Sequence, residues 1–232
     1  MVRSRDDIYR MADLKGKKIG LSRSQNKIKT DWWGIQEEQG IELMLRMNGM
    51  TRDDVEIVEF PYPDDWYDVP EMMGPPMENP SELWLKRDRK HDLAFRSLET
   101  ALENGVIDAM YSQSKVLSVL SETTGKFKSI EDLSHYPDWT LQVANVPAAI
   151  TCTTEMAEQH PVVTFLKGMI KVGRWGNEHK HAAAAILDKQ TFYRDVEDTF
   201  EGIRRVDLVP NLSPQNLVSV GIGKDFMLSH GY

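Results

Sequence analysis

Short apolar runs alternate with amphipathic stretches through the first half of the chain. The runs that we predict as buried strands are Ile19–Leu21, Val55–Phe60 and Val106–Tyr111. Between them, apolar residues recur at helical spacing from Asp31 to Gly49 and from Ala94 to Asn104. A glycine after each helical stretch is a typical stop signal. The order strand, helix, strand, helix, strand indicates an α/β sheet.

The second half of the chain has a mainly helical pattern. We predict a fourth strand between Ala148 and Thr153, and helices behind Pro161, over about 178–188, around Phe192–Phe200 and after Ser213–Pro214. Less regular segments fall between the predicted elements: a long, proline-rich loop over 61–80, a short helix over 113–123 and a loop over 125–138.

The charge of the chain restricts the kind of partner. Its 232 residues have a formal net charge of -8, which argues against a nucleic-acid partner, because phosphate binding needs a basic face. The same field repels an anionic ligand, so local donors must hold any anion that binds. Cys152 is the single cysteine, and an intramolecular disulfide is therefore impossible.

The sequence leaves the cellular compartment open. No stretch approaches the roughly 18 apolar residues of a membrane span. The first seven residues have no apolar core, so we see no signal peptide. We therefore expect a cytoplasmic protein as the sequence stands, or a periplasmic one if the true N-terminus is missing.

The best candidate for chemistry is the polar segment that leaves the first predicted strand. Ligands of open α/β sheets bind beyond the carboxyl ends of the strands. Backbone N–H groups, a helix dipole, two hydroxyls and the basic residues Arg23, Lys27 and Lys29 would supply local positive potential. The structural alternative is a capping serine beside a solvated basic face. The ligand-binding residues that we predict in and beside this segment are Ser22, Arg23, Ser24, Gln25 and Trp32.

A second candidate segment follows the third predicted strand. Tyr111, Ser112 and Gln113 would face the same cleft and could orient a polar ligand, although a capped strand end is an equal alternative. Trp32 and its neighbour Trp33 could stack on a ligand or pack as core, and we expect at least one of them to be core.

Catalytic and metal-binding patterns are weak. Cys152 in an apolar strand is typical of inert packing, and we assign no catalytic residue. His179 and His181 fall on different faces of a helix, so we expect no metal site and no cofactor. Phosphate-loop, dinucleotide-binding and nucleophile-elbow motifs are absent from the sequence.

Several segments resemble the nitrate-, sulfonate- and taurine-binding proteins of ABC importers. The segment Asp13–Gly20 is similar to the "DLKGKKIG" sequence that opens the second lobe in that family. Asn104–Ala109 resembles the family's "SGxVDA" segment, and the helix from His160 resembles "HPxxVxxFL", with Trp175 at a matching tryptophan position. The resemblance implies a type II periplasmic-binding-protein-like α/β fold.

Within this superfamily, the resemblance is closest to the hydroxybiphenyl sulfinate desulfinase branch. The stretches that carry it are Gln39–Met44 through Asp53–Val58, Asp68–Pro70 and Asp108–Ser112. The family has a first-lobe segment ahead of "DLKGKKIG", whereas this sequence starts about a dozen residues before that point. The nucleophilic cysteine of the desulfinases and their anion-holding histidine and arginine belong to that segment, so none of them is carried over, and Cys152 does not match the nucleophile.

Together these inferences predict one complete lobe and part of a second. Residues 13–138 would form the α/β lobe, and residues 139–232 would supply the returning strand and C-terminal helices of the incomplete first lobe. We expect partly exposed apolar faces on those helices, and hence oligomerisation or poor solubility.

The expected function is a solute-binding module that closes on a small organic anion of the sulfonate or sulfinate class in an inter-lobe cleft. The alternatives are a desulfinase-like hydrolase that cleaves a carbon–sulfur bond of an aromatic sulfinate, and a non-binding remnant or interaction protein. Expected partners are the anionic ligand together with an ABC transporter permease or a second chain that completes the first lobe.

Overall fold

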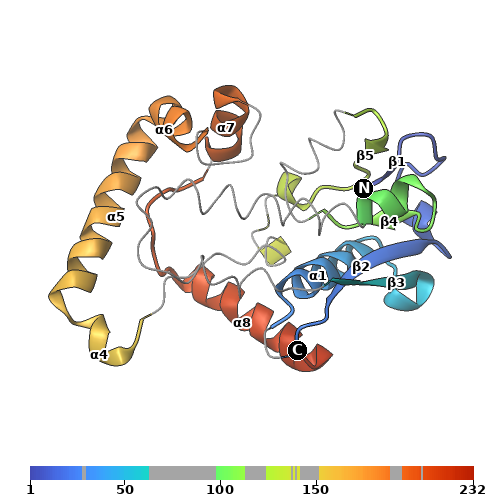
Figure 1. The fold of residues 1–232 in the computed structure, drawn as a ribbon, viewed down its shortest axis with the longest axis horizontal. Helices are drawn as coiled ribbons and strands as arrows, with labels where there is room; N and C mark the ends of the chain where they lie inside the picture. The colour runs from blue at the N-terminus through green and yellow to red at the C-terminus, as the bar shows by residue number, and fades with distance from the viewer. Residues whose placement is uncertain are drawn as a thin grey trace. The chain divides into compact units, whose positions relative to one another are not determined.

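The computed structural model describes residues 1–27, 30–62, 98–112, 124–136, 138, 140–141, 152–188, 195–204 and 206–232. The chain forms two compact units (Figure 1). Unit 1 contains Met1–Val146 and Ser219–Tyr232, and unit 2 contains Pro147–Val218. These two units do not test the predicted boundary between lobes at residue 138. The assignment of lobes therefore stays a prediction.

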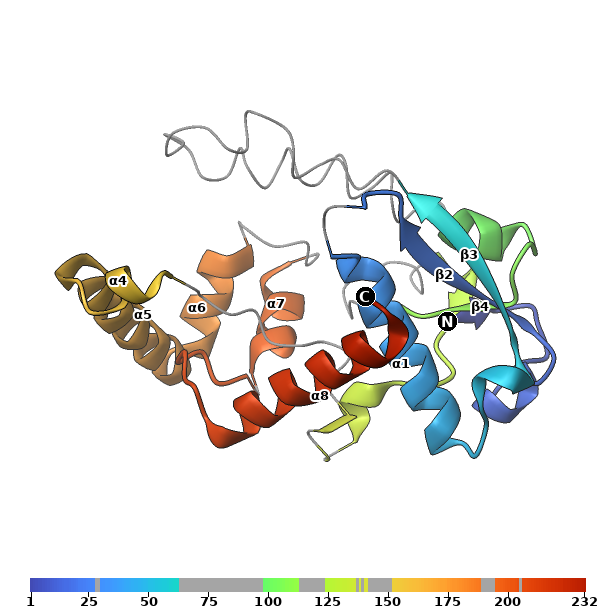
Figure 2. The same cartoon turned by 90° about the horizontal axis from the view of Figure 1, so that it is seen from below.

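A mixed five-stranded sheet is the framework of unit 1. Its strands are β1 (Val2–Arg3), β2 (Lys18–Ser24), β3 (Glu56–Tyr62), β4 (Ala109–Met110) and β5 (Phe127–Lys128). The spatial order is β3-β2-β4-β1-β5, with β2 parallel to β3 and β4, and β1 antiparallel to β4 and β5. Figure 2 shows β2 and β3 side by side. The predicted α/β class is confirmed.

Helix α1 (Trp32–Met47) follows β2 and begins and ends where the pattern predicts. Asp31 caps its first turn by accepting a hydrogen bond from the N–H of Gly34 at 2.9 Å. Its last turn is followed by Gly49 with a φ of 68°, a left-handed conformation that favours glycine. Helix α1 therefore leaves the carboxyl end of β2 through a short connection, which brings its N-terminus to the edge of the sheet.

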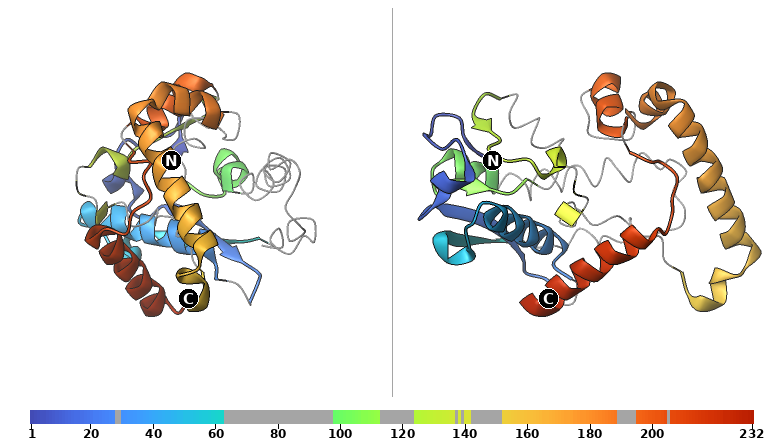
Figure 3. Two further views of the ribbon diagram at one scale, coloured as in Figure 1. Left: turned by 90° about the vertical axis from the view of Figure 1, so that its left-hand side faces the viewer. Right: turned by 180° about the vertical axis from the view of Figure 1, so that it is seen from behind.

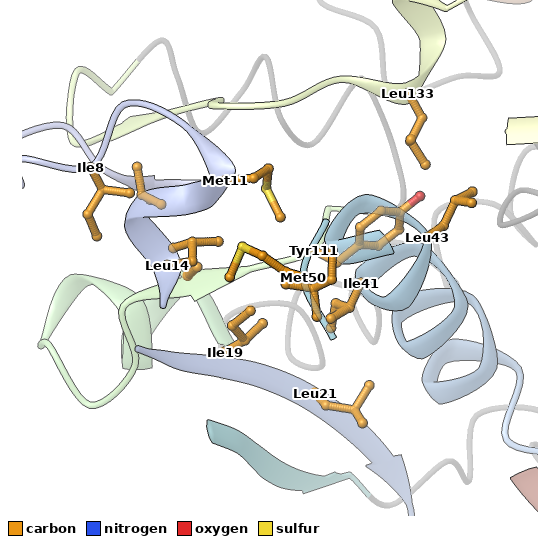
Figure 4. Packing of buried hydrophobic residues seen from close by; sticks show 13 residues of the cluster. Ile8, Met11, Leu14, Ile19, Leu21, Ile41, Leu43, Met50, Tyr111 and Leu133 are labelled. Atoms are coloured by element: carbon orange, nitrogen blue, oxygen red, sulfur yellow. The ribbon is translucent and has the colours of Figure 1, made fainter. Parts of the chain in front are cut away.

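Two apolar clusters cover the two faces of this sheet. Ile19 and Leu21 of β2 pack with Ile41 of α1 in the larger cluster (Figure 4). Leu45 of α1 belongs to the same cluster. Gly20 points to the other face, where an added Cβ would lie 2.6 Å from Ile107 and 2.7 Å from Leu98. This close approach explains why the position is a glycine. The helix over 98–103 packs on that face in the smaller cluster, whose buried members are Leu98, Ala101, Leu102, Ile107, Met110 and Phe127.

The C-terminal part of α8 (Pro214–His230) belongs to unit 1 from Ser219 onward. Ile222 packs against the larger apolar cluster, and the imidazole of His230 lies 3.0 Å from a carboxylate oxygen of Glu42 on α1. This end of the chain is thus fixed against the same helix that borders the candidate site.

Unit 2 consists of helices over the residues that the structure describes. These are α4 (Thr154–Ala157), α5 (His160–Glu178), α6 (Lys180–Leu187), α7 (Val196–Ile203) and the start of α8 (Figure 3). Pro161 lies in the first turn of α5, as predicted. The apolar cluster of this unit is small, with Ala183, Ala184 and Ile203 as its buried members.

Some predictions on element boundaries were incomplete or wrong. The first strand runs to Ser24 rather than to Leu21, and the predicted loop over 125–138 contains β5 and a 3-10 turn at Leu133–His135. Strand β1 had no sequence signal. Residues 63–80, 113–123 and 148–151 lie outside the described residues, so the long loop, the short helix and most of the fourth strand are untested. Thr153, at the predicted end of that strand, caps α4 instead.

Candidate functional site

The candidate site lies where β2 and β4 end. These strands are parallel, and their register pairs Ile19 with Ala109 and Gly20 with Met110. The last residues of β2 with Gln25, and Tyr111–Ser112 after β4, therefore lie at the same edge of the sheet, beside the N-terminus of α1. Ligands of open α/β sheets bind at such an edge. The strand order thus brings together the two segments that the sequence singled out.

The carboxylate of Asp31 organises this edge. It accepts hydrogen bonds from the backbone N–H groups of Gly34 and Ser24, at 2.9 and 3.0 Å, and from the hydroxyl of Tyr62 at 2.9 Å. One side chain thus joins the ends of β2 and β3 to the start of α1. The negative charge also lies at the positive end of the helix dipole. Asp31 occupies the place at the helix N-terminus that we expected for an external anion.

A second carboxylate, that of Glu37, satisfies Ser22. The backbone N–H of Ser22 donates to one oxygen of Glu37 at 2.6 Å, and its hydroxyl lies 3.1 Å from the other oxygen. Glu37 is 3% exposed. We expected free backbone N–H groups in this segment, but those of Ser22 and Ser24 are used by Glu37 and Asp31. The reason is that α1 packs its first turns against the end of β2.

The guanidinium of Arg23 is also held within unit 1. It donates to Glu59 at 2.8 Å, to Glu38 at 3.0 Å and to the hydroxyl of Tyr232. Burial opposes its charged form, but the hydrogen bond to Glu59 and the charge of Glu38 leave the pKa of Arg23 above its ordinary value. Arg23 is therefore a permanent cation whose donors face acceptors of this chain.

Two predicted residues present exposed side chains at this edge. Gln25 is exposed, and its backbone N–H donates to the carbonyl of Tyr62 at 2.9 Å, which holds its backbone at the edge. Trp32 is 46% exposed and meets Trp33 edge-on, with ring centroids 4.3 Å apart. Trp33 is half-buried. An amide donor and an aromatic surface are thus available to a ligand, together with the exposed Lys27.

Tyr111 differs from its expected orientation toward a cleft. Its side chain is buried, and its ring packs over Gly40 among apolar residues that include Leu43 and Leu133 (Figure 4). The cavity beside Tyr111 is largely apolar and has a volume of about 30 Å³, which suits one water molecule rather than an organic anion. Ser112 is half-buried, and Gln113 lies outside the described residues.

A charged network lies next to the site, and the sequence analysis did not predict it. Glu38 is 3% exposed and binds Arg23, Arg52 and the hydroxyl of Tyr232. Burial opposes its charged form, but the hydrogen bonds from Tyr232 and Arg52 keep the pKa of this carboxyl below its ordinary value. The network joins β2, α1 and the end of α8, which come from distant parts of the sequence.

A wide groove elsewhere in unit 1 also has a basic lining. It has a volume of about 520 Å³ and includes Arg3, Arg5, Glu103 and Lys126. Arg3 is paired with Asp6 and Asp108, and Lys126 lies 2.5 Å from Glu103. Arg3 and Lys126 are thus neutralised by neighbours, and Arg5 donates to the carbonyl of Glu103 at 3.3 Å, so these side chains hold the turns around the helix over 98–103.

The described residues give little support for other chemistry. Cys152 is exposed and comes just before the cap of α4. Among the residues that the structure describes, no three histidine, cysteine, aspartate or glutamate side chains are placed to hold a metal ion. The described helices also include none that is long and apolar enough to cross a membrane.

The mixed sheet with flanking helices has the fold of periplasmic-binding-protein-like domains. Solved structures with this fold include the desulfurization enzyme DszB, which matches with a TM-score of 0.65 and 18% identity over 99% of this chain and 68% of DszB. A cysteine-to-serine variant of DszB in complex with biphenyl-2-sulfinic acid matches with a TM-score of 0.63 and 18% identity over the same shares.

A transport protein gives a similar match. It is the putative periplasmic sulfonate-binding protein SsuA of an ABC transporter from Methylobacillus flagellatus KT, with a TM-score of 0.61 and 17% identity. The match covers 99% of this chain and 57% of SsuA. No known family profile matches the sequence, and no curated protein matches it. The comparisons therefore show the fold that the sequence resemblance implied.

Proposed function

We propose that this chain is a binding module for a small organic anion of the sulfonate or sulfinate class. The observation that carries the proposal is that two solved structures match 99% of this chain, one of a sulfonate-binding protein and one of an enzyme variant in complex with a sulfinic acid. SsuA is described as sulfonate-binding, and the DszB variant is in complex with a sulfinic acid. A sulfonate and a sulfinate both consist of a sulfur oxyanion on an organic group.

The edge beyond β2 supplies chemistry for the organic part of such a ligand. The exposed face of Trp32 offers an apolar surface for an alkyl or aromatic group, and Gln25 offers an amide donor. The net charge of -8 and the carboxylates of Asp31 and Glu37 oppose a free anion there. The oxyanion is therefore directed to cationic side chains such as Lys27 and to donors of an opposing lobe that closes over it.

Thermal unfolding in the presence of ligands tests this proposal. The panel consists of alkyl and aryl sulfonates, biphenyl-2-sulfinic acid, nitrate and an uncharged biphenyl. A ligand at 100 times its dissociation constant adds about 2.7 kcal/mol of stability. We expect stabilisation by a sulfonate or sulfinate and none by the uncharged compound.

Two variants locate the binding. Trp32→Ala removes the exposed aromatic surface and is expected to abolish most of the ligand-dependent shift. Tyr9→Ala removes a tyrosine that is 69% exposed and lies outside the two segments of the candidate site, and the shift is expected to persist. The absence of any shift with every anion of the panel would rule out the binding module.

A carbon–sulfur hydrolase is the second candidate, and the match to DszB favours it. Such an enzyme would add water to an aryl sulfinate and release the arene and hydrogen sulfite. We assign no nucleophile, because Cys152, the single cysteine, is an exposed residue just before the cap of α4. Release of sulfite from biphenyl-2-sulfinic acid, abolished by Cys152→Ser, would replace the binding module with the enzyme.

A further inference from the structure

The imidazole of His230 lies between two acceptors at the end of α8. Its Nδ1 is 2.9 Å from the backbone carbonyl oxygen of Phe226, and its Nε2 is 3.0 Å from a carboxylate oxygen of Glu42 on α1. A neutral imidazole has one N–H and one acceptor nitrogen, whereas an imidazolium has two N–H groups. The charged ring therefore satisfies both contacts at once, and the neutral ring leaves the lone pair of one nitrogen facing an oxygen.

The surroundings of the ring also favour a positive charge. His230 is in the last turn of α8, where the helix dipole attracts cations. Its ring stacks on that of Phe226, with centroids 4.0 Å apart, and an aromatic face attracts a cation. The side chains of His230 and Glu42 are 24% and 29% exposed, so water screens their interaction only in part. Protonation of His230 thus strengthens the contact between α8 and α1.

The hydroxyl of Ser229 offers the neutral ring a different arrangement. Its Oγ donates to the carbonyl of Phe226 at 2.8 Å and lies 3.0 Å from Nδ1 of His230. When Nδ1 loses its proton, the hydroxyl can turn and donate to it, because a hydroxyl hydrogen rotates. Nε2 then keeps its N–H toward Glu42, but the ring has no charge. The contact therefore has two states, an ion pair and a neutral hydrogen bond, and the ion pair is the stronger.

The other charged groups at this contact keep their charge while a histidine titrates. They are Glu38 on α1, Tyr232 after α8, and Arg52 on the 3-10 turn after α1, whose guanidinium lies 3.4 Å from Glu42. Burial opposes the charged form of Glu38, but hydrogen bonds from Tyr232 and Arg52 keep its pKa below the ordinary value. Burial raises the pKa of Tyr232. Histidine is the side chain that changes its charge between pH 5 and 8. In that range the charge balance of the contact follows His230.

We propose that His230 and Glu42 form a proton-dependent clasp, which holds the end of α8 on α1 more tightly when His230 is protonated. Because the imidazolium makes the additional contact, the clasp is strongest at the acid end of the histidine range and weakens as the pH rises through it. The same helix end places Tyr232, whose hydroxyl binds Glu38 beside Arg23 of the candidate site. The clasp is therefore a conformational device next to that site, and it is independent of which ligand the protein binds.

Hydrogen exchange in the full chain without ligand tests the clasp. Exchange rates divided by the intrinsic rates at each pH give the protection of the amides over 227–232, with peptides of β2 as the internal reference. In the wild type we expect about threefold or more protection of these amides at pH 5.5 relative to pH 8.5. His230→Gln retains an amide donor but has no titrating ring, and its protection is expected to be the same at both pH values.

Two further variants separate the clasp from a purely structural contact. Glu42→Gln removes the carboxylate and is expected to lower the ratio of protection between the two pH values. Ser229→Ala removes the hydroxyl that serves the neutral ring, so it is expected to raise that ratio by lowering protection at pH 8.5. Unchanged protection of the β2 peptides shows that each variant is folded.

Three results would overturn the proposal. The first is the same pH ratio in the wild type and in His230→Gln, and the second is the same ratio in the wild type and in Glu42→Gln. The third is a ratio in Ser229→Ala that is no higher than that of the wild type. Stronger wild-type protection at pH 8.5 than at pH 5.5 would also contradict it, because the sign would then be reversed.

Discussion

The hydroxyl of Tyr232 donates a hydrogen bond to the carboxylate of Glu38, 194 residues earlier in the chain. The same carboxylate accepts from Arg23 at 3.0 Å and from Arg52. The Arg23 guanidinium also lies 5.3 Å from the centre of the Tyr232 ring, within the range of a cation–π interaction. Glu38 therefore connects the candidate site, the helix α1 and the end of the chain.

Replacement of Glu38 by alanine should strongly destabilise unit 1. The change leaves the half-buried Arg23 without one of its carboxylate partners and removes the acceptor of Tyr232. Breaking a buried ion pair costs about 3–5 kcal/mol, and we expect the lower end because Arg52 is partly hydrated. Urea unfolding measures the loss. Glu103→Ala, which breaks the exposed pair with Lys126, should cost less than about 1 kcal/mol. Equal losses would show that Glu38 is no more than a surface charge.

The stability of the protein should depend on pH through Glu38. Its pKa in the folded state lies below the ordinary value of 4.5, so the ionised carboxylate stabilises the fold above that pH. This stabilisation is lost as the pH falls through the folded-state pKa. We therefore expect the wild-type unfolding midpoint to fall more steeply below pH 4.5 than that of Glu38→Gln. Parallel curves for the two proteins would mean that Glu38 has the same pKa folded and unfolded.

Gly40→Ala should destabilise α1 although alanine favours helices. A methyl group at this position overlaps the ring of Tyr111, which is buried and has little space to move. Overpacking of this kind costs about 1–3 kcal/mol. Gly221→Ala in α8 is the matched control, because no atom lies within 4 Å of the added group. It should stabilise by about 0.5–1 kcal/mol. Stabilisation by both alanines in urea unfolding would contradict the packing of Tyr111 on α1.

Asp31→Ala should lower the free energy of unfolding by more than an ordinary cap substitution does. Removal of a helix cap costs about 1 kcal/mol, and this carboxylate additionally holds the N–H of Ser24 and the hydroxyl of Tyr62. We expect a total of about 2–3 kcal/mol by urea unfolding. Asp31→Asn retains an acceptor and should lose less than half of that amount. An alanine variant as stable as the asparagine variant would remove Asp31 from the role that we assign to it.

The local pattern of apolar residues predicts the centre of unit 1 well. Ile19 and Leu21 alternate with Gly20, and this alternation predicts a buried strand in the position of β2. Asp31 and Gly49 mark the ends of α1 because their capping roles depend on local backbone geometry. Strand β1 consists of Val2 and Arg3 alone, and no periodicity exists in two residues. Its pairing with β4 depends on contacts across more than a hundred positions.

The location of the site could be predicted from the sequence, but the carboxylates that bind its backbone and hydroxyl groups could not. The order of strands and helices places Ser22 and Ser112 at one edge of the sheet. That Glu37 reaches Ser22 depends on the rotation of α1 against β2, which follows from packing rather than from sequence spacing. Asp31 was detectable as a residue ahead of a helix, but its contact with Tyr62 joins the start of α1 to the end of β3. For the same reason, the buried ring of Tyr111 could not be distinguished from a ligand-facing one.

Hydrogen exchange with and without ligand is the most direct test of binding at the edge beyond β2. The protein is incubated with the sulfonate or sulfinate that gives the largest thermal shift, and amide exchange is followed by mass spectrometry. We predict slower exchange in peptides that cover Ser22–Lys27 and the first turn of α1 around Trp32, and no such change in the Trp32→Ala variant. Unchanged exchange in these peptides, with protection at another part of the chain or none, would contradict the site.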